Sequence, residues 1–316
     1  MISFIIPVFQ NELTIDQTFA EVQRLIKESV GIAYEFIFIN DGSTDDSWNR
    51  IQKLSQIHPE VSGISFSRNF GQVPAINAGL NLCKGDAAIV LSADLQDPPE
   101  MILKLLDAWQ NGEEIVIAYR IAREDRWTSR LVSSIFYRSI RAAIPSMPAG
   151  GFDFVLLGRK AINAYNQLKS KNRFFQGDVL WLGYPTKMLP YKRVARTKGK
   201  SQWTIKRKLK YFIDAWLNSS YLPIRLMSLS GVITAFAGFI YAMVVVYARM
   251  INHVPFKGYA PIVILILLIG GLVMIMLGII GEYLWRILDE VKTKPEYIIS
   301  EYSGFEDPSS GTEKIK

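Results

Sequence analysis

Short hydrophobic runs alternate with amphipathic stretches along the first 120 residues of the chain. In the stretch 14–29, Ile15, Phe19, Val22 and Ile26 recur at helical spacing, which predicts an amphipathic helix. Because buried parallel strands are almost continuously apolar, the alternation predicts an α/β fold with a mostly parallel, doubly wound sheet. The predicted strands are 2–8, 35–40, 61–67, 87–92 and 113–119, and the predicted helices are 14–29, 47–57, 72–83 and 99–112.

Two later apolar runs, 226–248 and 259–281, are far longer and contain no charged residue. As helices they would each extend about 34 Å, enough to cross a hydrocarbon core of about 30 Å. Buried core helices are the alternative, but soluble helices rarely continue so far without a charge. The pattern therefore predicts four parts: a soluble domain over 1–200, an interfacial helix over 201–225, a two-helix transmembrane domain over 226–285 and a tail over 286–316.

Basic residues are concentrated just before the first long run, in a chain of net charge +7. Close to this charge, Leu209, Phe212 and Trp216 lie on one helical stripe, a combination typical of a helix at a lipid surface. The charge bias predicts that both termini and the soluble domain are cytosolic. No aromatic reading surface accompanies the charge, which argues against nucleic acid as a partner. Cys83 is the only cysteine, so no internal disulfide is expected, and no basic leader precedes the first strand.

Candidate ligand-binding residues follow each of the first four predicted strands. In doubly wound sheets, ligands bind beyond the carboxyl ends of the strands, so we expect these residues to line one crevice. No GxGxxG or GxxxxGK[ST] sequence is present to cradle a phosphate, which favours a divalent metal in that role. The candidates are Pro7 and Phe9, Asn40 and Asp41, Ser67, Arg68 and Asn69, and Ser92, Asp94, Gln96 and Asp97.

Asp94 and Gln96 offer hard oxygen ligands two residues apart, which suits Mg²⁺ or Mn²⁺ shared with substrate phosphates. The alternative is that Asp94 and Asp97 cap the helix that begins near Pro98. Capping suits Asp97 but leaves Asp94 and Gln96 without a role. Asp41 has two interpretations, either an acceptor for a base imide or ribose hydroxyl, or a turn former in NDGSTDD.

Several motifs occur in order along nearly the whole chain: IIPVFQNE, FINDGSTDDS, SADLQDPPE, GGFDFVLLGRKA, RFFQGDVLWLGY and GEYLWRILDEVKTKPEYII. With the two long apolar runs, they resemble the polyprenyl-phosphate glycosyltransferases of glycosyltransferase family 2, which include bactoprenol glucosyltransferases and dolichol-phosphate mannose synthases. The resemblance covers about residues 2–300. It implies a Rossmann-like GT-A domain that transfers one sugar from a nucleotide-sugar, such as UDP-glucose, to polyprenyl (undecaprenyl) phosphate with inversion. It also implies Mg²⁺ or Mn²⁺, a bacterial inner-membrane location and a homo-oligomer, a tetramer by resemblance.

The resemblance also assigns roles to positions that match the family motifs. Asp94 and Asp153 would be catalytic, and Asp94 and Gln96 would bind the metal. Arg130, Arg196 and Ser201 would lie near the acceptor phosphate. The nucleotide-sugar would contact Pro7, Phe9, Glu12, Asp41, Ser43, Arg68, Asn69, Ser92 and Asp94.

A phosphate acceptor needs no general base, since its second pKa is about 6 and it is already largely dianionic at neutral pH. Asp153 would then orient a sugar hydroxyl or a cation, or alternatively cap the loop beside Gly151. Ser92 replaces the first acid of the family's D-x-D motif, and Val155 and Gln72 also depart from the pattern. These departures bear on donor choice and keep an inactive nucleotide-sugar-binding scaffold as an alternative. A processive polysaccharide synthase is a second alternative, weakened by two spans and no Q-x-x-R-W motif.

Overall fold

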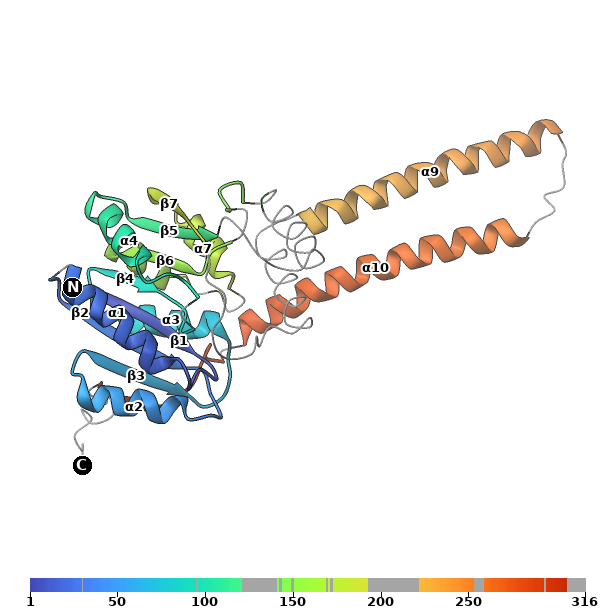
Figure 1. The fold of residues 1–316 in the computed structure, drawn as a ribbon. Coiled ribbons are helices and arrows are strands. Elements are labelled where there is room, and N and C mark those ends of the chain that lie inside the picture. Colours follow the sequence, from blue (N-terminus) through green and yellow to red (C-terminus); the bar gives the residue numbers. More distant parts are fainter. Residues whose placement is uncertain are drawn as a thin grey trace, which may run out of the picture. The chain divides into compact units, whose positions relative to one another are not determined.

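The computed structural model describes residues 1–29, 31–94, 96–120, 141, 144–148, 151–168, 170, 173–192, 222–252, 259–292 and 294–305 (Figure 1). The chain divides into two compact units. The first is Met1–Asn218 with Lys294–Lys316, and the second is Ser219–Thr293. The predicted interfacial helix, 201–225, lies outside the described residues as far as position 221.

The first unit is built on one mixed sheet with strand order β7-β5-β6-β4-β1-β2-β3-β8. Neighbouring strands β4, β1, β2 and β3 are parallel, whereas β6 and β8 run antiparallel to their partners. The predicted α/β class with a mostly parallel sheet is therefore confirmed. The strands are β1 (Ile2–Val8), β2 (Tyr34–Asn40), β3 (Val61–Phe66), β4 (Ala87–Val90), β5 (Ile115–Arg120), β6 (Phe154–Gly158), β7 (Thr186–Tyr191) and β8 (Ile299–Ser303).

Helices cover both faces of this sheet. On β1, Phe4 and Ile6 belong to one hydrophobic core and Ile5 to the other, because successive side chains point to opposite faces. Burial on both faces explains why the strands are apolar throughout. The first core is covered by α1 (Ile15–Ser29), α2 (Ser47–Ile57) and α4 (Met101–Gln110), and the second by α3 (Gln72–Leu82), α6 (Arg159–Asn166) and α7 (Phe175–Trp181).

The segment after the second long helix is part of the first unit's sheet, although the sequence suggested a tail over 286–316. Strand β8 pairs antiparallel with β3, with Ile64 opposite Tyr302. The ring of Tyr297 stacks on that of Phe66 at 4.9 Å. The five residues of β8, ISEYS, do not alternate regularly between polar and apolar positions, so no strand pattern separates them from a polar terminus.

The second unit consists of two long helices, α9 (Leu222–Asn252) and α10 (Tyr259–Val291). Among the described residues, one stretch, Ile269–Val291, is long and apolar enough to cross a membrane, and Leu229–Tyr241 is a shorter apolar stretch. One candidate span is thus found where the sequence predicted two. Its exposed side chains include Met274, Ile275 and Leu277, and so large an apolar surface requires lipid or protein to cover it.

Candidate active site

The carboxyl ends of β4, β1, β2 and β3 lie side by side at one edge of the sheet, as the sequence predicted. Strand β6 runs the other way, and its register pairs Val155 with Val90. Residues just before β6 therefore lie at the same edge as residues just after β4. This register places Asp153 at the edge that carries Asp94. Strands β5 and β7 end there too, at Arg120 and Tyr191.

Asp41 lies at the end of β2 and is 4% exposed. Its carboxylate accepts hydrogen bonds from the side-chain amide of Asn69 at 2.9 Å and from the backbone amides of Phe70 at 2.6 Å and Gly71 at 2.9 Å. Next to it, Gly42 adopts a φ of +64°, and a Cβ there would lie 2.3 Å from the carbonyl carbon of Arg68. Asp41 and Gly42 together hold the loops after β2 and β3 against each other.

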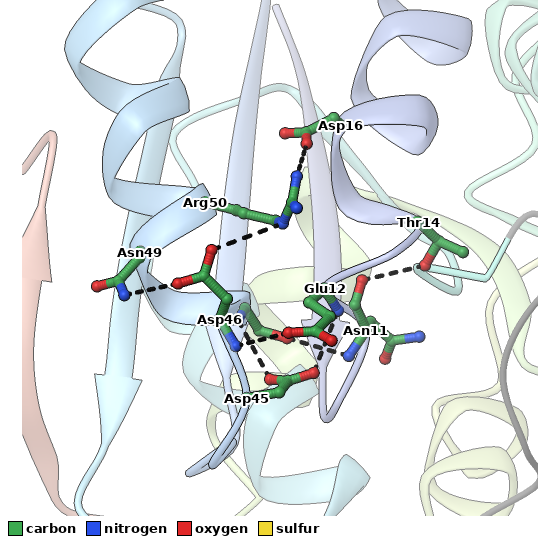
Figure 2. A network of polar contacts seen from close by, with 9 residues as sticks. Asn11, Glu12, Thr14, Asp16, Asp45, Asp46, Asn49 and Arg50 are labelled. Carbon is green, nitrogen blue, oxygen red and sulfur yellow. Dashed lines mark hydrogen bonds and ion pairs between the residues drawn. The ribbon is translucent and has the colours of Figure 1, made fainter.

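The loops after β1 and β2 are also joined by polar contacts (Figure 2). The Glu12 carboxylate accepts from the backbone amide of Asp46 at 2.9 Å, and the Glu12 amide donates to Asp45. The hydroxyl of Ser43 accepts from the backbone amide of Gln10, a residue with a φ of +54°. Both Glu12 and Ser43, predicted to contact the donor, thus help to fix the shape of the loops that carry them.

Pro7 and Phe9 are partly buried at the end of β1. Arg68 is exposed after β3, and its guanidinium carbon lies 4.0 Å from the centre of the Phe70 ring. An aromatic side chain after β1 and a cationic one after β3 thus lie on the loops on either side of the strand that ends just before Asp41. Such side chains are suited to a nucleoside and its phosphates.

Asp94 is held in place just after β4 and is 6% exposed. The Ser92 hydroxyl donates to its Oδ1 at 2.7 Å, and the Gln96 backbone amide donates to the same oxygen at 3.3 Å. Two buried hydroxyls of the first helical region, Thr14 and Thr18, donate to the carbonyl of Ala93 at 2.6 and 3.0 Å. Hydrogen bonds from Thr14 and Thr18 therefore fix the turn that carries Asp94. Ser92, at the position where the family motif has an acid, orients Asp94.

Within the described part of the chain, no group of three or more His, Cys, Asp or Glu side chains could hold a metal. Mg²⁺ and Mn²⁺ need no such group when substrate phosphates supply most of the oxygens. Asp94 has its Oδ1 bonded to Ser92 and Gln96, an arrangement that keeps the carboxylate in one orientation. Asp94 and the side chain of Gln96 fit a metal shared with a diphosphate, and do not fit a site made by protein alone.

A second polar network links Asp153 to the ends of β5 and β7. The Arg120 guanidinium donates to Asp153 Oδ2 at 2.7 Å and, through Nε, to the Tyr191 hydroxyl at 3.2 Å. The Tyr191 hydroxyl in turn donates to Asp97 at 2.5 Å. From the other side, the Gln176 amide donates to Asp153 Oδ1 at 3.4 Å and to the Phe152 carbonyl at 2.6 Å.

The charges in this network are strongly coupled. Burial opposes the charge on Arg120, but Asp153, Tyr191 and Asp97 together raise the pKa of its guanidinium above the usual value. Burial and the Asp97 carboxylate raise the pKa of the Tyr191 hydroxyl, so it stays protonated and remains a donor. The network thus holds a cation beside Asp153 in a largely buried setting.

Three residues of this network, Arg120, Tyr191 and Gln176, were not identified from the sequence. The signal for Arg120 was available, since it is a charge at the end of an apolar strand, like the other candidates. Asp97 corrects an expectation, because α4 begins at Met101 with Glu100 at its N-cap, and the carboxylate of Asp97 accepts from Tyr191. Arg130, Arg196 and Ser201 lie outside the described residues.

Comparison with known proteins supplies the family. Residues 3–165 match the model of glycosyl transferase family 2. The uncharacterized glycosyltransferase YkcC of Bacillus subtilis is 35% identical over 96% of this chain and 94% of its own. The SfII prophage-derived bactoprenol glucosyl transferase of Shigella flexneri is 34% identical over 94% of this chain and 97% of its own.

Solved structures agree on the fold. A crystal structure of glucosyl-3-phosphoglycerate synthase from Mycobacterium tuberculosis, in complex with Mn²⁺, UDP-glucose and phosphoglyceric acid, superposes with a TM-score of 0.51. It is 16% identical and covers 69% of this chain and 79% of the other. Sequence and structure together place this chain in glycosyl transferase family 2, and it is a glycosyltransferase with a GT-A-like fold.

Proposed function

We propose that the protein transfers a single sugar from a nucleotide-sugar, with UDP-glucose the favoured donor, to polyprenyl (undecaprenyl) phosphate. The observation that carries this proposal is the meeting of Asp94 and the Arg120–Asp153 pair at one sheet edge. Asp94 would supply a carboxylate for a metal bound to the diphosphate. The Arg120–Asp153 pair supplies a carboxylate held in place beside a cation. The relative of nearly equal length named a bactoprenol glucosyl transferase supports the lipid acceptor, and the distant synthase crystallised with UDP-glucose and Mn²⁺ supports the donor.

On the donor side, Asp94 and Gln96 would hold Mg²⁺ or Mn²⁺ against the diphosphate. Such a metal neutralises the charge that develops on the leaving diphosphate. Ser92 would act through its hydrogen bond to Asp94. The nucleoside would lie over the loops carrying Pro7, Phe9, Glu12, Asp41, Ser43, Arg68 and Asn69.

On the acceptor side, an oxygen of the lipid phosphate attacks the anomeric carbon. The bond from that carbon to the nucleoside diphosphate breaks on the opposite face, and the configuration inverts. No proton leaves the dianionic acceptor, so the reaction depends on position and charge control. Asp153, fixed by Arg120 and Gln176, would orient a sugar hydroxyl, and Arg130, Arg196 and Ser201 would contact the acceptor phosphate.

The acceptor's polyprenyl chain requires the site to work at a membrane. We propose that α9 and α10 both span the bacterial inner membrane, with catalytic unit and termini on the cytosolic side and the short connection outside. The charge-free runs 226–248 and 259–281 and the basic segment before the first run support this topology. A homo-oligomer, a tetramer by family resemblance, completes the proposal.

The test uses full-length protein in detergent micelles, radiolabelled UDP-glucose and a short-chain polyprenyl phosphate. We expect organic-soluble label that disappears with EDTA and returns with Mg²⁺ or Mn²⁺. Asp94→Asn should lower transfer at least about a hundredfold, a typical loss for a group that stabilises charge in the transition state. Asp107→Asn, an exposed acid on α4, is the matched control and should match wild type.

Three outcomes would contradict the proposal. Long polymer instead of singly glycosylated lipid would indicate a processive synthase. Donor binding without transfer under any metal condition would indicate a binding scaffold. Full activity of Asp94→Asn would remove the metal–diphosphate site from the reaction.

A further inference from the structure

The segment that follows the second long helix is tied into the catalytic unit by a buried side chain. Glu296 lies five residues after the end of α10. Its carboxylate accepts a hydrogen bond of 2.6 Å from the amide of Asn77 on α3. Asn77 is 1% exposed, and its own carbonyl accepts from the hydroxyl of Tyr165 on α6 at 2.8 Å. Glu296 thus bonds to α3 and is connected to α6 through Asn77.

The chain of contacts continues from Tyr165 to α7. The guanidinium of Arg173 lies 4.0 Å from the centre of the Tyr165 ring and forms a 2.9 Å ion pair with Asp178 on α7. The Arg173 side chain is 5% exposed, so its charge needs nearby acids. Asp178 and Glu296 both act electrostatically on it. Burial raises the pKa of each acid above its usual value, and the charge of Arg173 offsets only part of that rise.

α7 is the helix that carries Gln176, two residues before Asp178. Gln176 is 3% exposed and donates to both the Phe152 carbonyl and the Asp153 carboxylate. A shift of α7 would therefore move the group that fixes Asp153 on the side opposite Arg120. The C-terminal segment itself is held firmly, since the amide of Ser67 donates to the Ile298 carbonyl at 3.0 Å, just before β8.

We propose that Glu296 is a positioning residue for glycosyl transfer, acting through Asn77, Tyr165, Arg173 and Asp178 to keep Gln176 against Asp153. The inference rests on the proposed function, because it assumes that Asp153 orients the reacting sugar. It means that the polypeptide leaving the second long helix is a structural part of the active site. The C-terminal segment that begins at Lys294 and the residue Asp153, both in the first unit, are then linked by side chains as well as by sequence.

The experiment compares Glu296→Ala with a control on the same segment. Glu301 on β8 accepts from Trp48 and Gln52 of α2, and within the described part of the chain it forms no hydrogen bond with α7. Glu301→Ala therefore loosens the segment without touching the network. We expect Glu296→Ala to lower kcat about tenfold, the effect of weakening one transition-state hydrogen bond, with donor KM within about threefold of wild type. Glu301→Ala should keep wild-type kcat, although its melting temperature should be comparable to that of Glu296→Ala.

Two further variants make the test specific. Glu296→Gln keeps an acceptor for Asn77 and should retain kcat within about threefold of wild type. In the double variant with Gln176→Ala, the loss should not exceed that of Gln176→Ala alone, because both changes act on one path. If Glu296→Ala does not fold, Asp178→Asn, which weakens the pair with Arg173 and keeps its shape, should show the same selective fall in kcat.

Wild-type kcat in Glu296→Ala, an equal loss in Glu301→Ala, or additive losses in the double variant would overturn the inference. These results would leave the proposed function intact, since wild type would still transfer sugar to lipid. Failure of wild type to do so would instead reject the proposed function, and the role of Glu296 with it.

Discussion

The hydroxyl of Tyr191 is the most informative single group to remove from the second network. The residue is 4% exposed, and its hydroxyl accepts from the Arg120 guanidinium and donates to the Asp97 carboxylate. Tyr191→Phe keeps the ring and its edge contact with Phe154, so the change removes two hydrogen bonds and little packing. Both lost bonds involve charged groups.

A hydrogen bond to a charged group contributes about 1.5–3 kcal/mol to stability. Arg120 keeps its bond to Asp153 in the variant, so we take the lower end for each bond and expect a loss of about 3 kcal/mol. For a unit of this size, a loss of 1 kcal/mol lowers the melting temperature by about 2–4 °C, which predicts a fall of roughly 6–12 °C. Activity should fall as well, because Arg120 would no longer be fixed beside Asp153.

The assay is thermal unfolding of the full-length protein in one detergent, followed by tryptophan fluorescence. The matched control is Tyr184→Phe, whose hydroxyl forms no hydrogen bond with the described residues. It should melt close to wild type. A melting temperature for Tyr191→Phe within about 2 °C of wild type would refute the argument that this network is an important source of stability.

Three further predictions concern the frame around the site. Gly42→Ala should prevent donor binding or folding, since its Cβ would meet the Arg68 backbone at 2.3 Å and its φ is positive; calorimetric titration with UDP checks this. Thr18→Val should lower the melting temperature by a few degrees, because the hydroxyl that holds the Ala93 carbonyl is lost, whereas Thr44→Val, at an exposed position, should not. Burial raises the pKa of the Cys83 thiol, so alkylation at pH 8 should be slow in native protein and fast after unfolding, and rapid native labelling would contradict this.

Much of the fold follows from local patterns. The first five strands and four helices lie within about two residues of their predicted bounds. Each strand is buried on both faces, and α1, α2 and α4 each bury an apolar stripe, whereas α3 is buried over most of its length. Strands β6, β7 and β8 were not predicted. β6, FVLLG, is a short apolar run inside the motif GGFDFVLLGRKA, and periodicity alone does not separate such a run from a helix. β7 contains Pro190 and lies at a sheet edge, where side chains are only partly buried.

Some residues of the candidate site were identified from the sequence, and their hydrogen-bond partners were not. Asp41, Asp94 and Asp153 were found because strand ends and motif spacing mark them. Their partners were not, since the pairing of Arg120 with Tyr191 depends on β5 lying beside β7, and these strands are separated in sequence by three other described elements. The role of Glu12 in joining the loops after β1 and β2 was missed for the same reason, because it depends on the loop around Asp46 being close in space.

The place of β8 in the sheet has a consequence for how the protein is made. Its residues leave the ribosome only after both long helices, so β3 keeps an unpaired edge while the chain between Phe66 and Ile299, about 230 residues, is synthesised. At roughly 5–20 residues per second, that interval is about 10–50 seconds, during which an open strand edge is prone to pair with other chains. The sheet is therefore completed only after both long helices have been synthesised, although the other seven strands described in it precede them in the chain.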